Sequence, residues 1–237
     1  MTISIRSDPA AAPPPGALAL ELSGARLVAL PSGALWWPEA GLLAAGDLHL
    51  GRPARTARTG AGLIPPYGDR DTLDRLGADL AATGAARVVC VGDSFDCALS
   101  AAEVAPALAR RVAALAAGRD WLWIAGNHDP RAPALPGRWA AEAAVGPLIF
   151  RHAARGEATA GEVSAHYHPK AVLRHRGRRI ARRCFLWDAR RLILPAYGTF
   201  TGGLDARDPA LARLLGREAQ AGLTGPRVTA LPLAALG

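Results

Sequence analysis

The segment Gly46-Asp47-Leu48-His49-Leu50-Gly51 places an aspartate and a histidine two residues apart. It directly follows an apolar run at residues 40–45, which predicts a buried strand. A strand end fixes the backbone, while the following loop lets both side chains turn towards one point. A carboxylate and an imidazole together suit a divalent transition metal. Asp47 and His49 are therefore the first candidates for chemistry in this chain.

Further polar clusters end apolar segments downstream, at Gly92-Asp93, Gly126-Asn127-His128-Asp129, His152 and His166-Tyr167-His168. Two metal ions that share a bridging carboxylate explain such a set economically. Carboxylate, amide and imidazole ligands without thiolates suit Mn²⁺, Fe²⁺ or Zn²⁺, whereas Mg²⁺ accepts so many imidazoles poorly. We expect two divalent ions, with Mn²⁺ favoured and Fe²⁺ or Zn²⁺ as alternatives.

The elements before these clusters predict an α/β arrangement. Residues 69–84 and 104–118 have the apolar spacing of helices, and residues 87–91 and 121–125 are typical of buried strands. Strands that alternate with helices favour a parallel sheet, and binding sites in such sheets lie at the carboxyl edge. The polar clusters follow these strands, so we expect them to meet at that edge.

The remaining segments are assigned more coarsely. Residues 51–68 hold no period and are expected to form a long loop, and the chain after Trp139 is expected to be mostly β. Residues 1–17, with a Pro-Pro-Pro-Gly run, are expected to be a mobile N-terminal tail. Because no composition break follows, residues 18–237 are interpreted as a single domain.

The order of these motifs resembles that of the calcineurin-like metallophosphoesterase superfamily. The matching pieces are D-x-H at Asp47, G-D at Asp93, G-N-H-D at residues 126–129, His152 and H-x-H at residues 166–168. A nearer resemblance is to the ligase-associated DNA-damage-response endonucleases of bacteria, the PdeM-type group. That likeness rests on the segment around Asp47, on His166-Tyr167-His168-Pro169, and on Leu194-Pro-Ala-Tyr-Gly-Thr-Phe-Thr-Gly-Gly203.

The resemblance implies a fold and a ligand set. The fold is a four-layer αββα sandwich with two stacked mixed sheets. One metal ion would be held by Asp47, His49, Asp93 and His168, and the other by Asp93, Asn127, His152 and His166, so that Asp93 bridges. His128 would stand beside the phosphate as a catalytic proton donor. Asp129 is expected to orient the His128 ring, although a capping role in the loop is an equal alternative.

The expected activity follows from this ligand set. Two ions roughly 3.5–4 Å apart can clamp the attacking and leaving oxygens of an in-line displacement. A metal-bridging hydroxide, formed near neutral pH, would attack the phosphorus. The resemblance implies a metal-dependent phosphodiesterase or endonuclease that hydrolyses DNA, single-stranded or in repair intermediates. It also implies a functional association with a DNA ligase and a helicase.

Composition and charge agree with this interpretation without requiring it. The 237 residues carry a formal net charge of +8, almost entirely from arginine, which fits a polyanionic partner such as DNA. An arginine-for-lysine bias would raise the charge equally well. Three cysteines without C-x-x-C spacing argue against a disulfide framework and a thiolate zinc site. We expect a cytoplasmic protein without membrane association; its oligomeric state is left open.

Two groups of arginines are candidates for phosphate contacts. Arg52, Arg55 and Arg58 directly follow His49, and at least one of them is expected to contact the substrate. A second group lies in a β-rich segment and would form a basic patch if alternate residues share a face. It comprises Arg174, Arg176, Arg178, Arg179, Arg182, Arg183, Arg190 and Arg191. Arg176 and Arg178 are the substrate-binding candidates there, and a solvated hairpin is the alternative.

Other functions remain open at this stage. The same metal site could serve a small-molecule, nucleotide-directed phosphodiesterase or a phosphatase, and a non-catalytic scaffold of the same fold is a further alternative. One departure from the resembled pattern concerns the metal loop itself. Ala165 stands where glycine is usual before the H-x-H histidines, and its methyl group is expected to crowd the backbone slightly.

Overall fold

The computed structural model describes residues 12–60, 64–98, 104–131, 133–156, 160–175 and 177–236. The first eleven residues of the expected tail lie outside this range. The end of the expected tail is described, and the Gly16 carbonyl accepts a hydrogen bond from the Val228 amide at 2.8 Å. The mobility of the tail therefore stays a prediction.

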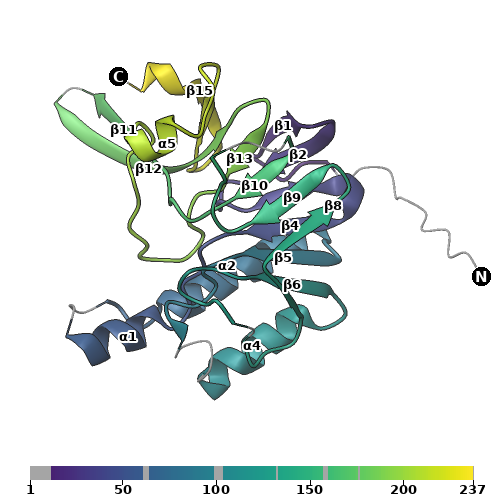
Figure 1. Ribbon diagram of the computed structural model, residues 1–237. Coiled ribbons are helices and arrows are strands. Elements are labelled where there is room, and N and C mark those ends of the chain that lie inside the picture. Colours follow the sequence, from purple (N-terminus) through teal and green to yellow (C-terminus); the bar gives the residue numbers. More distant parts are fainter. Residues whose placement is uncertain are drawn as a thin grey trace, which may run out of the picture.

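The first sheet has seven strands in chain order (Figure 1). They are β1 (Leu18–Leu22), β2 (Ala25–Ala29), β3 (Leu35–Trp37), β4 (Leu42–Ala45), β5 (Arg87–Val91), β6 (Asp120–Ile124) and β7 (Arg138–Ala140). Neighbours from β1 to β4 pair antiparallel, and β4 to β7 pair parallel. The parallel half follows from the strand–helix alternation, because a helical crossover returns the chain to the same edge.

The second sheet has the order β15-β14-β12-β13-β10-β9-β8, with β11 paired to β12. Its strands are β8 (Glu142–Val145), β9 (Leu148–Arg151), β10 (Glu162–Ser164), β11 (Lys170–His175), β12 (Arg178–Trp187), β13 (Arg191–Ile193), β14 (Gln220–Leu223) and β15 (Thr229–Pro232). Strands β9, β10 and β13 are parallel to one another, and the remaining pairs are antiparallel. The expectation that the second half is mostly β is confirmed.

The helices of the described ranges are α1 (Arg52–Thr59), α2 (Gly68–Thr83), α4 (Pro106–Ala116) and α5 (Pro209–Ala212), with 3₁₀ turns η1 (Pro38–Ala40) and η2 (Leu233–Ala235). Helices α2 and α4 cover the outer face of the first sheet. Leu73, Leu76 and Leu80 form the apolar stripe of α2 and pack against the first sheet together with Val112 of α4. None of the helices in the described ranges has the length and hydrophobicity that crossing a bilayer requires.

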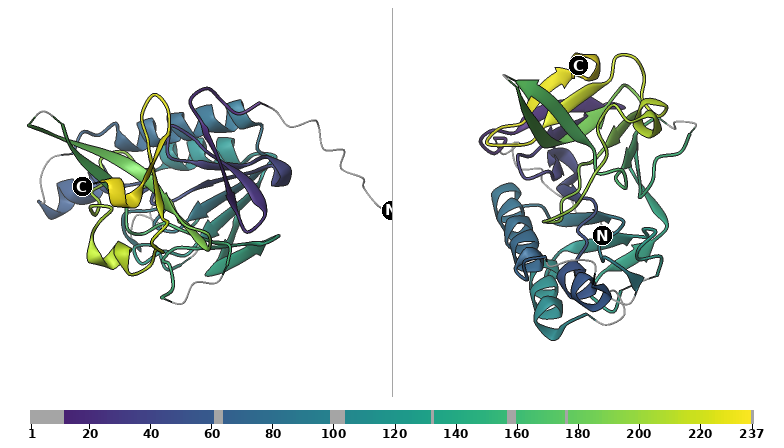
Figure 2. Two further views of the ribbon diagram at one scale, coloured as in Figure 1. Left: turned by 90° about the horizontal axis from the view of Figure 1, so that it is seen from above. Right: turned by 90° about the vertical axis from the view of Figure 1, so that its left-hand side faces the viewer.

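The two sheets stack on each other, as the views in Figure 2 show. Val89, Leu122 and Ile124 of the first sheet pack against Phe150 and Leu192 of the second, and all of them are almost fully buried. The outer face of the second sheet is covered more thinly, by α5 and the chain around Leu214 and Leu215. The expected sandwich of two mixed sheets is therefore confirmed.

The expectation of a loop throughout residues 51–68 is wrong, because helix α1 occupies its first half. Gly51 and Gly60 bound this helix in left-handed conformations, and a proline lies in its first turn. The sequence of α1 is Arg-Pro-Ala-Arg-Thr-Ala-Arg-Thr, which has no apolar stripe. Hydrophobic periodicity therefore could not reveal it.

Candidate metal centre

Three loops at the carboxyl edge of the first sheet carry candidate ligands. The parallel register pairs Ala45 with Cys90 and Val91 with Ile124, so β4, β5 and β6 end side by side. Asp47 and Asp93 each lie two residues beyond their strand, and Asn127 lies three residues beyond β6. The amide of Asp47 donates to the Gly92 carbonyl at 3.1 Å, which joins the first two loops.

The second sheet contributes its ligands in the same way. His152 directly follows β9, and His166 and His168 follow β10. These two strands pair parallel, with Val163 opposite Phe150, so their carboxyl ends lie together. The His166 amide donates to Asp47 Oδ2 at 2.9 Å, which connects the loops of the two sheets. The seven predicted ligands are thus brought to one shared rim.

The backbone at this rim is strained. Seven non-glycine residues in the described chain have positive φ, and five of them are predicted ligands: Asp47, His49, Asp93, His166 and His168. A left-handed conformation is unfavourable for residues with a Cβ and persists only where surrounding structure enforces it. Such strain concentrates at functional sites, and here it turns each side chain towards the space between the sheets.

Glycines before the ligands allow close packing of the loops. A Cβ on Gly92 would overlap the His152 ring, and one on Gly126 would overlap Asp93. A Cβ on Gly46 would overlap the Ala165 methyl group. The G-D and G-N-H-D motifs therefore need glycine because a neighbouring loop occupies the position of a side chain.

The first group of donor atoms comes from Asp47, His49 and His168, whose ligand atoms lie within 4.8 Å of one another. His49 Nε2 is 3.2 Å from His168 Nε2, and His168 Nε2 is 3.3 Å from Asp47 Oδ1. Asp47 and His49 are buried. Asp47 Oδ1 has no hydrogen-bond partner among the described residues, which leaves a buried carboxylate oxygen facing two imidazoles.

The second group comes from Asp93, His152 and His166. His152 Nε2 lies 3.2 Å from Asp93 Oδ2 and 3.1 Å from His166 Nδ1. It also lies 3.0 Å from Asn127 Oδ1. His152 Nδ1 faces the Val91 carbonyl at 3.2 Å, which can only accept, so Nδ1 carries the proton.

Both groups fit divalent metal ions. When His152 is neutral, its Nε2 lone pair faces the Asn127 oxygen, the Asp93 carboxylate and the His166 ring, so a cation or a proton must lie between them. Ligands at about 2.0–2.1 Å from one ion lie roughly 3–3.4 Å from each other. His168 Nε2 has this spacing from His49 Nε2 and Asp47 Oδ1, and His152 Nε2 has it from Asp93 Oδ2 and His166 Nδ1. The two groups are not fully separate, because His152 Nδ1 lies 3.9 Å from Asp47 Oδ1.

The electrostatics of the metal-free site reflect the same crowding. Burial alone would raise the pKa of Asp93, but the His152 ring and the His128 amide lower it to about 2. Burial opposes protonation of His152, yet the Asp93 and Asp47 carboxylates raise the pKa of this ring. Burial and the neighbouring His152 lower the pKa of His166. Asp93 therefore stays ionised across the physiological range, as a bridging ligand requires.

His128 lies at the edge of this site, and its ring is held from behind. Its Nδ1 is 2.8 Å from the Asp96 carbonyl, which accepts only, so Nδ1 carries a proton. Its Nε2 faces inward, 3.9 Å from Asp93 Oδ2. The Asp129 carboxylate binds the amides of Phe95 and Gly126 instead of this ring. The expected role of Asp129 in orienting His128 is therefore corrected, because the Asp96 carbonyl already occupies that position.

From the sequence, Asp96 could support a metal ligand or simply belong to a turn. Its side chain is almost fully buried, and its Oδ1 lies 3.1 Å from His49 Nδ1. Arg52 and Arg55 of helix α1 contact the same carboxylate at 3.7 and 2.9 Å. Asp96 thus connects a predicted metal ligand to α1, in the manner of carboxylates that orient ligating histidines.

The predicted phosphate contacts meet different surroundings. Arg52 and Arg55 pair with Asp96 but stay partly exposed, at 26% and 41% of their side-chain surface, so a substrate contact stays a prediction. The side chains of Arg58 and Arg178, and Arg176 entirely, lie outside the described part of the structure. Arg179 and Arg182 are exposed on β12. The predicted patch is thus described only in part.

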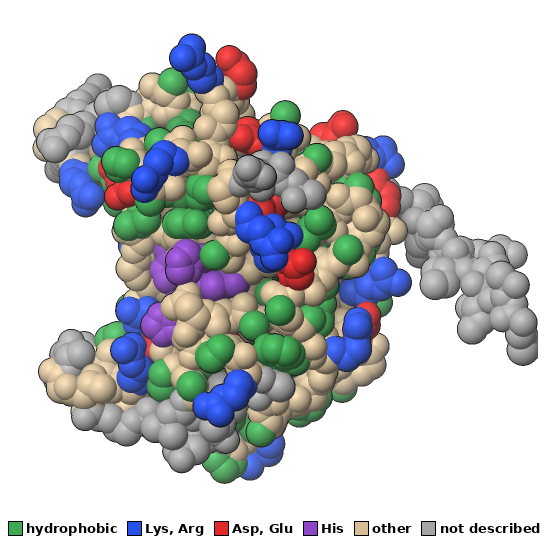
Figure 3. Space-filling model, viewed as in Figure 1, with side chains coloured by type: hydrophobic (Ala, Val, Ile, Leu, Met, Phe, Trp, Pro, Cys, Tyr) green, Lys and Arg blue, Asp and Glu red, His purple; other side chains and the backbone are tan. Residues whose placement is uncertain are grey.

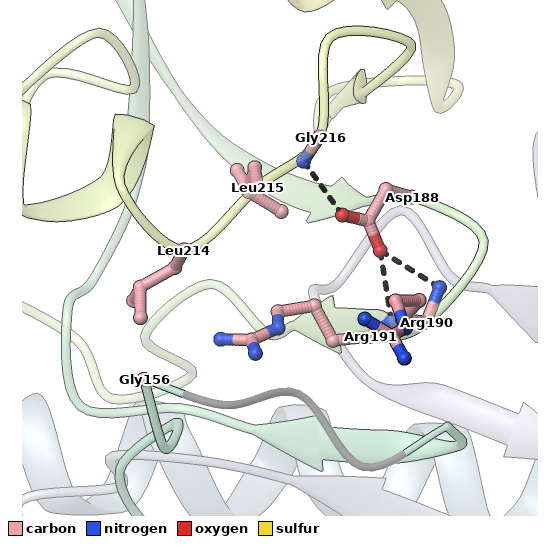
Figure 4. A pocket seen from close by; sticks show the side chains of 7 residues that line it. All are labelled: Gly156, Asp188, Arg190, Arg191, Leu214, Leu215 and Gly216. Atoms are coloured by element: carbon pink, nitrogen blue, oxygen red, sulfur yellow. Dashed lines mark hydrogen bonds between the residues drawn. The ribbon is translucent and has the colours of Figure 1, made fainter.

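Arg191 does not belong to any surface patch, because it is fully buried and lies 3.5 Å from Glu162 on the neighbouring strand. Glu162 also binds Arg151 at 3.0 Å. Figure 4 shows the cavity beside this position, with Asp188 bound to the amides of Arg190, Arg191 and Gly216. Parallel pairing of β10 with β13 places Arg191 opposite Glu162. The alternation of side chains along a single strand could not predict this pairing.

Ala165 fits the metal loop without a left-handed backbone. Its φ is not positive, and its methyl group is buried against Gly46. Gly46, which follows β4 of the other sheet, has no side chain, and this leaves the space that the Ala165 methyl group needs.

The chain is similar to known phosphoesterases. The family described as calcineurin-like phosphoesterase matches residues 41–185, more than half of the chain. The chain therefore belongs to the calcineurin-like phosphoesterase family and is a metal-dependent phosphoester hydrolase. No curated protein matches it significantly in sequence.

Two solved structures match the chain with very different similarity. The nuclease MPE of Pseudomonas putida is 27% identical, with a TM-score of 0.71 over 91% of this chain and 100% of its own. The phosphoesterase Yfce of E. coli is 12% identical, with a TM-score of 0.38 over 81% of this chain and 98% of its own. The first likeness agrees with the nuclease type of resemblance seen in the sequence motifs.

Proposed function

We propose that this calcineurin-like phosphoesterase is a two-metal nuclease that hydrolyses phosphodiester bonds in DNA. The observation that carries the proposal is the convergence of possible ligand atoms into adjacent groups. Two of the three groups in the described structure consist of predicted ligands, namely Asp47, His49, His168 and Asp93, His152, His166, and the third combines His49 with Asp96 and His128. Asn127 completes the second group at 3.0 Å from His152. Asp93 belongs to the second group and is the predicted bridging ligand.

The shape of the surface supports a polymeric substrate. Figure 3 shows the histidines in an open hollow, with basic side chains on the surface beside them. Helix α1 and the β11–β12 hairpin lie on the same side of the molecule in Figure 1 and in the left view of Figure 2. In the orientation shared by Figures 1 and 3, α1 lies below the level of the histidines and the hairpin lies above it. An open groove with cationic borders fits a strand, whereas a closed pocket would fit a small phosphate ester.

The protein's own groups then support the chemistry. When bound, two divalent ions supply a nucleophile at neutral pH and neutralise the charge of the phosphate. His128 Nε2 faces the site while Nδ1 is fixed to the Asp96 carbonyl. In its protonated form this ring can donate the Nε2 proton to the leaving oxygen. His128 is half-buried, which keeps it accessible to a substrate in the groove.

Cleavage assays test this proposal. Purified protein with Mn²⁺ should cut labelled single-stranded or flap DNA. Asp93→Ala should abolish cutting, because the second ligand group loses its only carboxylate and the site loses its predicted bridging ligand. Fe²⁺ and Zn²⁺ are tested beside Mn²⁺, and metal analysis should give close to two ions per chain. Hydrolysis of bis-p-nitrophenyl phosphate without any cleavage of DNA would overturn the DNA assignment in favour of a small-molecule phosphodiesterase.

A further inference from the structure

A second basic site lies away from the ligand groups. A cavity of about 450 Å³ is lined by Arg75 of α2, Lys170 of β11, and Arg182 and Arg183 of β12. We call it the basic cavity. None of its lining residues is acidic. The volume falls within the usual range for small-ligand sites.

The cations of the basic cavity are only partly compensated. Arg183 donates to the Gly198 carbonyl at 2.7 Å, and Arg75 donates to the Tyr197 carbonyl. Lys170 Nζ lies 3.3 Å from the Thr201 carbonyl. Carbonyl groups satisfy donors but carry no net charge, so the positive charge remains. Asp71 pairs with Arg75 at 2.9 Å and is the only carboxylate in ion-pair contact with any of the four within the described structure.

Two further observations indicate that these cations form an anion-binding site. Burial and the nearby Arg75 lower the pKa of Arg183 to about 10, which shows how closely the guanidinium groups are crowded. Arg75 Nε is buried and has no hydrogen-bond partner among the described residues. Ser32 and Thr224 add hydroxyl groups to the lining. Guanidinium, ammonium and hydroxyl donors together are the usual partners of a phosphate group.

The position of the basic cavity connects it to the reaction. Its cations hold the carbonyls of residues 197, 198 and 201. On the other side of this segment, the Tyr197 and Gly198 amides donate to the carbonyls of Gly46 and Asp47, both at 2.9 Å. One stretch of backbone therefore separates the basic cavity from the loop that carries a predicted metal ligand.

We propose that the basic cavity binds a backbone phosphate of the substrate strand other than the one that is cleaved. This inference rests on the proposed nuclease function. It assigns a substrate that extends beyond the scissile bond, because a small diester would not occupy both sites. The contact is to a phosphate, so binding at the basic cavity is independent of sequence.

Binding measurements with a chelator present test the inference without cleavage. Fluorescence anisotropy of a labelled single-stranded oligonucleotide over a series of chloride concentrations gives the slope of log K against log salt. Lys170→Gln/Arg182→Gln should bind more weakly and reduce this slope by about 0.7, the value for one phosphate contact on a single strand. Arg87→Gln/Arg138→Gln is the matched control, because both arginines lie on the first sheet and are exposed. This control should leave the slope unchanged.

Inorganic phosphate identifies the source of the anion. At constant ionic strength, phosphate should lower the oligonucleotide affinity of the wild type towards that of the cavity variant. It should lower the affinity of the cavity variant no more than chloride does. Equal slopes for wild type, cavity variant and control would overturn the inference. Phosphate binding that the cavity variant abolishes, with unchanged oligonucleotide affinity, would assign the basic cavity to free phosphate and also overturn it.

The failure of this inference is distinct from that of the proposed function. If the wild type cuts DNA with Mn²⁺ but the cavity variant has the same salt slope, only the proposed phosphate subsite is overturned. If the wild type hydrolyses small diesters but never DNA, the proposed nuclease function is overturned, and so is the assignment of the basic cavity to a strand phosphate. Thermal unfolding of each variant shows that its fold is intact.

Discussion

Asp96 joins a predicted metal ligand to a surface helix, which gives it a testable role. Its Oδ1 lies 3.1 Å from His49 Nδ1, so the His49 Nε2 lone pair points towards His168. Asp96→Asn keeps the shape but removes the charge, and loss of such an orienting carboxylate typically weakens metal affinity by ~10–100-fold. Calorimetric titration of Mn²⁺ into the metal-free variant should show this loss.

Arg55→Gln is the control, because it removes the 2.9 Å contact between α1 and Asp96 without touching His49. Equal weakening by both variants would place the effect in the helix instead of the ring. Wild-type Mn²⁺ affinity in Asp96→Asn would contradict the positioning role altogether.

Gly46 and Ala165 form a pair in which one position must lack a side chain. A Cβ on Gly46 would overlap the Ala165 methyl group, but its next contacts, at Ala165 Cα and Leu194, are ordinary at 3.7 Å. Gly46→Ala should therefore destabilise the protein by ~1–3 kcal/mol through overpacking. Adding Ala165→Gly should restore most of this loss, because the φ of Gly46 is not positive.

Urea unfolding of both single variants and the double variant gives the coupling between these positions. Simple addition of the two single effects would show that the methyl groups do not compete for one space. Ala165→Gly alone is the control for the backbone freedom that a glycine adds.

At this scale the sequence identified the side chains that the structure brings to one rim, because these residues follow the ends of apolar strands. It could not predict how Asp96 acts. The Asp96 carbonyl holds His128 and its carboxylate faces His49, and both contacts arise from the folding of three separate loops. Asp129, which adjoins His128 in the chain, binds the amides of Phe95 and Gly126 instead.

Among the elements, the segment 194–203 is held to helix α2 by a partly buried hydrogen bond. Tyr197 Oη donates to Asp79 Oδ2 at 2.8 Å, and Tyr197 is fully buried. Tyr197→Phe removes this donor from the half-buried Asp79 carboxylate. The expected cost is ~1–3 kcal/mol of unfolding free energy near neutral pH.

The cost of Tyr197→Phe should depend on pH. Burial raises the pKa of Asp79, while the Ser32 and Tyr197 hydroxyls lower it again. A raised carboxyl pKa contributes stability that is present below the ordinary pKa and lost as pH rises through the raised one. Removing Tyr197 Oη raises this pKa further, so the variant should lose most stability at neutral pH and little in acid.

Urea unfolding of metal-free wild type and Tyr197→Phe at several pH values measures this difference. Asp79→Asn/Tyr197→Phe is the control, because a neutral amide cannot ionise and its penalty should not vary with pH. A penalty of Tyr197→Phe that stays constant from acid to neutral pH would show that Asp79 is not the titrating group.

The elements show why a sequence predicts some parts and not others. Strands β4, β5 and β6 are short apolar runs that end at turn signals, and they were found close to their observed ends. Helix α1 was missed, because its contacts are polar: Thr56 and Thr59 bond back to the helix, and Arg55 binds Asp96. Strand β14 was missed too, and its pairing with β12 is a long-range contact.

For the whole molecule, the candidate metal centre lies where the two stacked sheets meet. Asp47, His49, Asp93 and Asn127 follow strands of the first sheet, and the remaining predicted ligands follow strands of the second. The pairing of β9 with β10 and β13, which brings the second set into place, could not be inferred from one sequence. The motif order nevertheless predicted that both sets share one site.

Ions bound between the sheets should stabilise the whole fold, because binding to the folded state alone adds about 2.7 kcal/mol at a concentration 100 times Kd. Mn²⁺ should therefore raise the midpoint of thermal unfolding, and a chelator should reverse the rise. Asp93→Ala should abolish this shift, since Asp93 belongs to the second ligand group and is the predicted bridge to the first.

His128→Ala should keep the Mn²⁺-induced shift of the unfolding midpoint and lose turnover, because its ring lies at the edge of the site. A His128→Ala protein that no longer responds to Mn²⁺ would show that this imidazole is a ligand and would overturn the division between binding and proton donation.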